Sequence, residues 1–283
     1  MDEAEQHNQQ QLAIYRQNVR YLLDQAAQFG GEGMAPLPVR NQLHSARTMI
    51  TTLKANLRAA GVVVVDATED FAPGQPDAPS AQALLDTMPL DVIPDLATLP
   101  PASRMPYASN PHFVGRDDAL LALAQALKDG GRVALGPRAA ATGLGGIGKT
   151  SVAAEFVHRY GQYFAGGVFW LSFADPAAVA GEVAACGGPG FLDLRPGFHD
   201  LKQDEKVALV TAAWRQDTPR LLVFDNCEDP RLVEAWAPPT GGCRVLITSR
   251  RQRWPGGLRV QTQRLSVLAR TNSIALLQQL APA

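Results

Sequence analysis

Apolar residues near the start of the chain recur at steps of three and four, the spacing that forms one apolar stripe along a helix. Two such runs cover residues 12–29 and 43–60, and Gly30, Gly31 and Gly33 interrupt the pattern between them. The stripes are formed by Leu12, Tyr15, Val19, Leu22, Ala26 and Phe29, and then by Leu43, Ala46, Ile50, Leu53, Leu57 and Ala60. We therefore predict an antiparallel helical hairpin over residues 1–66.

A lone hairpin of this length buries little apolar surface. We therefore expect its free face to bind a partner, either an effector protein or a second copy of the chain. Two other interpretations stay open: the hairpin packs on the rest of the chain, or it is an inert spacer.

Proline dominates the next segment, since nine of the 21 prolines lie between residues 71 and 111. Proline removes backbone donors and blocks regular helix. We therefore interpret residues 67–111 as a proline-rich linker. Its second half, from residue 92, is partly apolar, and lying on a domain surface is the alternative to a free spacer there.

The remaining residues, 112–283, alternate short apolar runs with helical patterns. The runs typical of strands are residues 139–142, 167–171, 220–224, 244–248 and 258–263. The helical patterns are residues 150–160, 204–214, 229–236 and 272–280. Strands alternating with helices indicate an α/β domain with a parallel sheet flanked by helices.

Residues 143–150 read GLGGIGKT, a complete match to the phosphate-binding P-loop pattern. The glycines allow a tight backbone curl whose N–H groups surround phosphate oxygens, and the following helix adds the positive end of its dipole. Lys149 is expected to contact the β- and γ-phosphates, and the Thr150 hydroxyl is expected to bind Mg²⁺. We assign nucleotide binding to Gly143, Gly145, Gly146, Gly148, Lys149, Thr150 and Ser151.

Two later strands end in residues suited to the same site. The run RLLVF leads into Asp225, and a buried strand would bring this carboxylate beside the P-loop as a second Mg²⁺ ligand. Capping of the next helix is the competing explanation for Asp225. Arg250 follows the strand at residues 244–248 and is expected to detect the γ-phosphate, with an ordinary surface arginine as the alternative. Lys149, Asp225 and Arg250 are thus the candidate catalytic residues.

Composition narrows the class of protein further. A net charge of −1 favours neither nucleic acid nor anionic lipid as a general partner. The acidic N-terminus is unlike a signal peptide, and no apolar run approaches the ~18 residues of a membrane span. Three scattered cysteines suggest neither a disulfide framework nor a metal site. A cytoplasmic protein is the expectation.

Five motifs, in this order, resemble the NB-ARC type of STAND signal-transduction ATPases, relatives of apoptosome and plant disease-resistance proteins. They are FVGRD at residues 113–117, the P-loop, GVFW at 167–170, LLVFD at 221–225 and LITSR at 246–250. The resemblance covers residues 92–283. It implies that Val114 and Arg116 lie near the adenine and sugar, and that Arg250 is the sensor of the γ-phosphate. It also implies an ATP/ADP switch in signalling or defence, closed with ADP and opened by ATP for oligomerisation.

The sequence departs from that family in two ways. Many relatives have a second acid after the magnesium aspartate, whereas this chain has Asn226. An amide cannot accept a proton from water, so at most slow ATP hydrolysis is expected. Glu228 is nearby but is not a simple replacement. The family's helical lid, winged helix and repeat sensor are absent up to Ala283, so we expect a longer protein.

Two other functions remain open. A P-loop kinase would need an acceptor pocket with its own base and a basic lid; residues 197–206 contain His199 and Asp200 but no convincing lid. A scaffold that binds nucleotide without hydrolysing it would fit Asn226.

Overall fold

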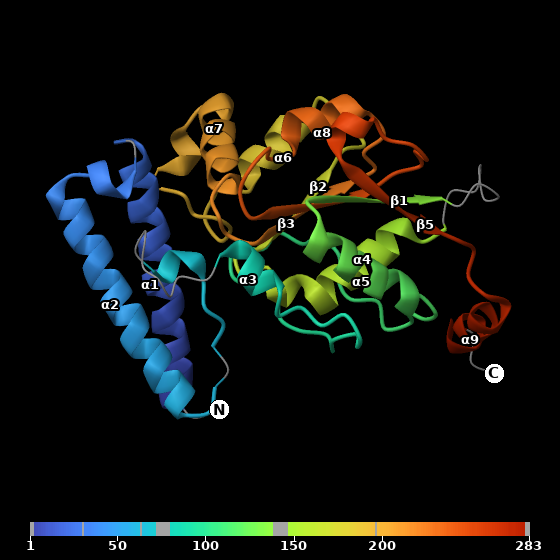
Figure 1. Cartoon of the computed structure of the whole chain (residues 1–283), viewed down its shortest axis with the longest axis horizontal. Helices are drawn as coiled ribbons and strands as arrows, with labels where there is room; N and C mark the ends of the chain where they lie inside the picture. Colours follow the sequence, from blue (N-terminus) through green and yellow to red (C-terminus); the bar gives the residue numbers. More distant parts are fainter. Residues whose placement is uncertain are drawn as a thin grey trace.

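The computed structural model describes residues 3–29, 31–62, 64–71, 80–137, 147–195 and 197–280. A pair of long helices lies at one end of the molecule, and an α/β part with a central sheet forms the rest (Figure 1). The helices are α1 (Glu3–Ala27) and α2 (Leu37–Ala59), joined by a short 3₁₀ turn, η1 (Glu32–Met34). The predicted helical hairpin is confirmed.

The hairpin has a core of its own. The apolar residues at helical spacing on α1 face those on α2, as the sequence pattern predicted. The buried set comprises Leu12, Val19, Leu22, Leu43, Ala46, Ile50, Leu53 and Leu57.

A layer of buried charge closes one side of the hairpin. The 3₁₀ turn η2 (Thr68–Asp70) folds back on the helices, where Asp70 pairs with Arg16 at 2.7 Å and with Lys54 at 3.0 Å. Glu69 pairs with Arg20 at 2.7 Å. The positive partners lower the pKa of Glu69 and of Asp70 in spite of the burial that opposes ionisation.

The central sheet has five parallel strands in the order β2-β3-β4-β1-β5. The strands are β1 (Arg132–Pro137), β2 (Val168–Ser172), β3 (Arg220–Asp225), β4 (Cys243–Thr248) and β5 (Val260–Leu265). The α/β class with an all-parallel sheet is therefore confirmed. The strand expected at residues 139–142 lies outside the described residues, and β1 ends just before it.

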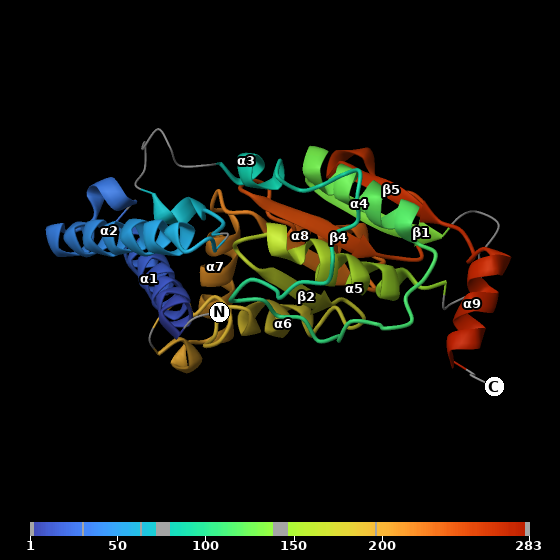
Figure 2. The same cartoon turned by 90° about the horizontal axis from the view of Figure 1, so that it is seen from below.

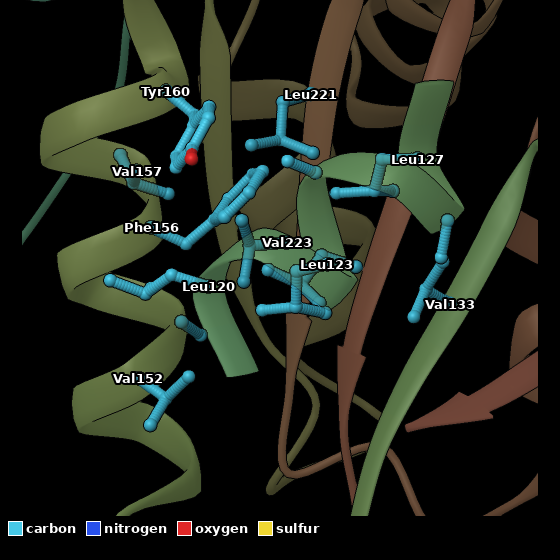
Figure 3. Close-up of a cluster of buried hydrophobic side chains, with 14 of the residues drawn as sticks. Leu120, Leu123, Leu127, Val133, Val152, Phe156, Val157, Tyr160, Leu221 and Val223 are labelled. Carbon is cyan, nitrogen blue, oxygen red and sulfur yellow. The ribbon is translucent and has the colours of Figure 1, made fainter. Parts of the chain in front are cut away.

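Helices cover both faces of the sheet (Figures 1 and 2). One face carries α4 (Asp117–Asp129) and α5 (Lys149–Tyr160), and the other carries α6 (Val179–Ala185), α7 (Gln203–Trp214) and α8 (Pro230–Trp236). Alternate residues of each strand point to opposite faces. Leu221 and Val223 of β3 accordingly pack with α4 and α5 (Figure 3), whereas Leu222 and Phe224 pack on the other side.

The proline-rich segment contains a short helix, α3 (Ala81–Leu85), whose Leu85 is buried in the core under α4 and α5. Further along, Arg104 pairs with the edge strand: its N–H donates to the Val168 carbonyl at 2.7 Å. Residues 80–111 thus pack along the α/β part, and the linker boundaries remain a prediction.

The hairpin contacts the α/β part through α1. Gln17 donates a hydrogen bond to Asp193, and a cavity of about 370 Å³ lies between the two parts. Asp24 of α1 faces Arg220 at the start of β3; burial raises the pKa of the Asp24 carboxyl to about 7, and the positive charges of Arg220 and Arg20 oppose that shift. The hairpin therefore packs at the end of β3 opposite Asp225.

The last helix, α9 (Arg270–Leu280), follows β5 and lies at the far end of the molecule from the hairpin (Figure 1). Among the described residues, no helix combines the length and apolar character needed to cross a bilayer.

Candidate functional site

The candidate site lies where the parallel strands end, the usual place for ligands in open α/β sheets. Strands β1, β4 and β3 are neighbours in the sheet, so their carboxyl ends lie side by side. This edge of the sheet is on the α9 side of the molecule, away from the hairpin (Figure 1).

Only the end of the P-loop falls within the described residues. Gly143, Gly145 and Gly146 lie outside them, whereas Gly148, Lys149, Thr150 and Ser151 are described. Gly148 caps α5 with φ 89° and ψ 22°, a left-handed conformation that favours glycine. Lys149 and Thr150 form the first turn of α5 and are partly exposed, so the positive end of the helix dipole is open to an anion.

The two candidate magnesium ligands meet at this edge. Thr150 Oγ1 donates to Asp225 Oδ1 at 3.1 Å, and the Thr248 hydroxyl donates to the same carboxylate oxygen. Asp225 is only 4% exposed, so the two hydroxyls hold its charge in one position. The alternative role of Asp225 as a helix cap is wrong, because Asp229 caps α8 and accepts from the Arg231 N–H at 2.9 Å.

Asn226, the residue after Asp225, lies outside the regular strand geometry. Its φ is 58°, a left-handed value that asparagine tolerates better than most residues. Its N–H donates to Thr248 Oγ1 at 2.9 Å, and its side chain is exposed. The backbone of Asn226 is thus held beside the candidate magnesium site, and the side chain at this position is an amide and not a carboxylate.

A cavity of about 560 Å³ opens beside the start of α5, within the range usual for small-molecule sites. One wall comes from the segment before α4, a second from the end of the P-loop, and a third from α9. Val114, Arg116, Gly148 and Ser151 all contribute to it, so the structure brings four sequence-predicted nucleotide contacts together. The other lining residues are Asn110, His112, Phe113, Ile147, Val152, Val267, Leu268, Ser273, Leu276 and Leu277.

Arg116 joins two of these walls. Its guanidinium donates to the Ile147 carbonyl at 3.1 Å and to the Ser266 carbonyl at 2.7 Å. Partial burial lowers the pKa of Arg116, although an arginine still carries its charge at neutral pH. Arg116 therefore connects the end of the P-loop to the segment that leads into α9, in addition to lining the cavity.

Gly115 permits the close approach of α9. It has φ +68°, and an added Cβ would lie 2.1 Å from Asn272 Nδ2 and 2.7 Å from Asn272 Cβ. A side chain at this position would therefore push α9 away from the cavity.

Arg250 follows β4 at the same edge, and its guanidinium is exposed. Its backbone N–H donates to Glu228 Oε1 at 2.8 Å, and the Ser249 hydroxyl donates to Glu228 Oε2 at 2.8 Å. Sequence reasoning did not find this contact, because nothing in the spacing of the two segments shows that they meet.

Tyr107 is a second residue that sequence reasoning missed. Its ring packs edge-on against Trp170 at 5.0 Å, and its carbonyl is a hydrogen-bond partner of His158 Nε2 at 2.9 Å. Burial, and then the negative charge of Asp225, raise the pKa of the Tyr107 phenol. The phenol therefore stays protonated, and able to donate, at neutral pH.

Comparison with known proteins finds relatives for part of the chain, although no family model matches it. It is 30% identical over 148 residues to the regulatory protein AfsR of Streptomyces griseus, covering 50% of this chain and 15% of that protein. AfsR of Streptomyces coelicolor is 28% identical over 53% of this chain and 15% of its own length. A nucleotide-binding leucine-rich repeat (NLR)-like protein of Hyaloscypha variabilis is 31% identical, over 44% of this chain and 12% of its own length. Over about half of its length, this chain is therefore similar to short portions of much longer proteins named as regulators or as NLR-like.

Proposed function

We propose that this chain binds ATP or ADP with Mg²⁺ and acts as a nucleotide-dependent signalling switch of the STAND type. One observation carries the proposal: Thr150 and Asp225 meet at 3.1 Å beside a cavity that extends from the end of the P-loop to α9. Both residues come from motifs that predict this contact from the sequence alone.

Polar groups at the start of α5 lie beside a cavity with mainly apolar walls. Phosphates would bind at the start of α5, where Gly148 and Lys149 provide backbone N–H groups, the helix dipole and a positive side chain. The nucleoside would lie between Val114 on one side and Leu276 and Leu277 on the other. Apolar walls of this kind suit a flat aromatic base.

A magnesium ion fits the residues present. Mg²⁺ prefers oxygen ligands and commonly binds one or two protein oxygens together with phosphate and water. The Thr150 hydroxyl and the Asp225 carboxylate are such a pair, and the Thr248 hydroxyl keeps the carboxylate oriented. When bound, the ion would neutralise phosphate charge.

The names of the relatives support the signalling part of the proposal, since they include two regulatory proteins and an NLR-like protein. A switch also needs a part that transmits its state. The hairpin is the candidate for this role, as a binding surface for an effector or for a second copy. On the hairpin, Ile14 is 49% exposed and Met49 is 40% exposed, so both side chains can contact a partner. Leu53 and Leu57 belong to the core between the two helices and are not available for this role.

Asn226 supports a second candidate, a scaffold that binds nucleotide without hydrolysing it. An exposed amide beside Asp225 offers no base for the attacking water. The kinase alternative has less support. His199 and Asp200 pair with each other at 3.2 Å and are largely exposed. They precede α7, which lies beside the hairpin (Figure 1), whereas the candidate phosphate site is at the edge of the sheet away from the hairpin.

The test is calorimetric titration of Mg·ADP and Mg·ATP into the wild type and Lys149→Ala. We expect binding by the wild type and loss of binding by the variant, with the circular dichroism spectrum and melting temperature retained because Lys149 is partly exposed. Equal affinity in the two proteins would refute the P-loop assignment. Turnover under the same conditions should be far below the ~10 s⁻¹ typical of enzymes.

A further inference from the structure

One acidic residue outside the phosphate motifs, Glu228, connects the segments that follow β3 and β4. Its carboxylate accepts from the Ser249 hydroxyl at 2.8 Å and from the Arg250 N–H at 2.8 and 3.1 Å. Both donors lie in the short turn where β4 ends. Glu228 therefore holds this turn through its side chain, in addition to the backbone pairing of the strands.

The turn is held from two other directions. The Ser249 N–H donates to the Leu135 carbonyl of β1 at 3.1 Å, and the Cys227 N–H donates to the Thr248 carbonyl at 3.0 Å. Ser249 is 1% exposed, so the chain cannot move there without disturbing β1 and β3 together. Arg250 thus leaves the sheet between the strand that precedes the P-loop and the strand that carries Asp225.

The Arg250 guanidinium, by contrast, is not held by its neighbours. It is exposed, and within the described residues it forms no hydrogen bond or ion pair. Its backbone is fixed, and its charged end is available to an anionic ligand.

The same hydrogen bonds limit what Glu228 can do. An ionised carboxylate has about four lone-pair positions, and three contacts to Ser249 and Arg250 already use most of them. A general base must instead be able to receive a proton from water. The contacts therefore favour a role in positioning over a role in proton transfer.

We propose that Glu228 is a positioning residue that holds Arg250 where its guanidinium contacts the terminal phosphate of a nucleoside triphosphate. The inference rests on the proposed function, and it assigns to Glu228 a part in the preference for triphosphate over diphosphate. A diphosphate lacks the group that Arg250 would contact, so loss of Glu228 changes only the affinity for the triphosphate.

The experiment compares the Kd values of Mg·ATPγS and Mg·ADP by calorimetry in wild type, Arg250→Ala, Glu228→Ala and the double variant. Arg250→Ala should weaken ATPγS binding about tenfold or more, the effect of losing a hydrogen bond to a charged group. Glu228→Ala should produce a similar loss, and the double variant should be within about twofold of Arg250→Ala. The Kd for ADP should change less than about twofold throughout.

Two further variants separate positioning from other effects. Glu228→Gln keeps an oxygen for the Arg250 N–H and an amide able to face the Ser249 hydroxyl, so it should retain both ATPγS affinity and the rate of hydrolysis. Glu234→Ala removes another exposed carboxylate, on α8, and should match the wild type.

The outcomes distinguish the inference from the proposed function. A wild type that binds neither nucleotide overturns both. If the wild type binds both nucleotides, two results overturn only the positioning role of Glu228. One is a Glu228→Ala variant that keeps the wild-type ratio of the two Kd values. The other is a double variant in which the effect of Glu228→Ala adds in full to that of Arg250→Ala. A Glu228→Gln variant that binds ATPγS normally but no longer hydrolyses ATP would show that Glu228 acts on water instead.

Discussion

The contact between Gly115 and α9 predicts that one added methyl group weakens nucleotide binding. In Gly115→Ala the new Cβ would lie 2.1 to 2.7 Å from three side-chain atoms of Asn272. Ordinary contact begins near 3.4 Å, so Asn272 must retreat by roughly 1 Å. Rotation of its amide does not relieve the contact with its own Cβ, so the first turn of α9 has to move.

The size of the effect follows from what α9 contributes to the cavity. Ser273, Leu276 and Leu277 form one of its walls. If their retreat exposes about 50 to 100 Å² of apolar surface on a bound nucleoside, the loss is about 1 to 3 kcal/mol, or roughly ten- to a hundredfold in the Kd for ADP. The left-handed φ of Gly115 adds about 1 to 2 kcal/mol of backbone strain, which lowers the stability of the fold.

Two controls separate the collision from the strain. Gly61→Ala introduces similar strain, since Gly61 has φ +77°, but its Cβ would meet nothing within 4 Å, so ADP binding should be unchanged. The double variant Gly115→Ala with Asn272→Gly removes the collision and keeps the strain, so ADP affinity should recover while the melting temperature stays low. Calorimetry and thermal unfolding measure the two effects separately. Unchanged ADP affinity in Gly115→Ala, with a lowered melting temperature, would refute the assignment of α9 to the nucleotide site.

Three other predictions concern hydrolysis, pH and the hairpin. Asn226→Asp should raise the slow rate of ATP hydrolysis by supplying a carboxylate beside Asp225, as a phosphate-release assay would show; an unchanged rate would mean that the missing acid is not limiting. Burial raises the pKa of Asp24 from 3.8 to about 7, so the folded state holds the proton of this carboxyl more tightly than the unfolded state does. The contribution of Asp24 to the free energy of unfolding is therefore largest below pH 4 and falls as pH rises through 7. The free energy of unfolding that is lost over this pH range is of the order of 4 kcal/mol. Asp24→Asn should remove this pH dependence, as denaturant titrations at several pH values would show. Ile14→Asp with Met49→Asp should abolish self-association or effector recruitment with ADP affinity unchanged, measured by ultracentrifugation and co-purification, whereas normal recruitment would identify the hairpin as a spacer.

The meeting of Thr150 and Asp225 was predictable from sequence, because a P-loop and an apolar strand ending in aspartate are brought to one edge by any parallel sheet. The contacts of Glu228 were not, since they depend on how two loops of irregular conformation approach each other. The left-handed φ of Asn226, which turns the chain after β3, has no signature in the spacing of the residues.

Other elements were missed although a signal was present. Leu120, Leu123 and Leu127 have helical spacing, and they face the sheet from α4. The apolar residues Val133, Ala134 and Leu135 of strand β1 are likewise consecutive in the sequence, and all three are buried. Pro137 is tolerated there because it is the last residue of the strand.

The order of the strands has a consequence for how the protein forms during synthesis. In the described part of the chain, strand β1 pairs with β4 and β5, which are made last of the five; Val133 lies opposite Leu246 of β4 and Gln261 of β5. A nascent chain that ends before Cys243 has the P-loop sequence but no strand beside β1 to hold it. Such long-range pairing slows folding, because a large loop must close before the contact stabilises anything. If the proposed function is right, nucleotide should stabilise the nascent chain only after β4 and β5 have been made, and it should speed the later steps in the folding of this sheet more than the early ones.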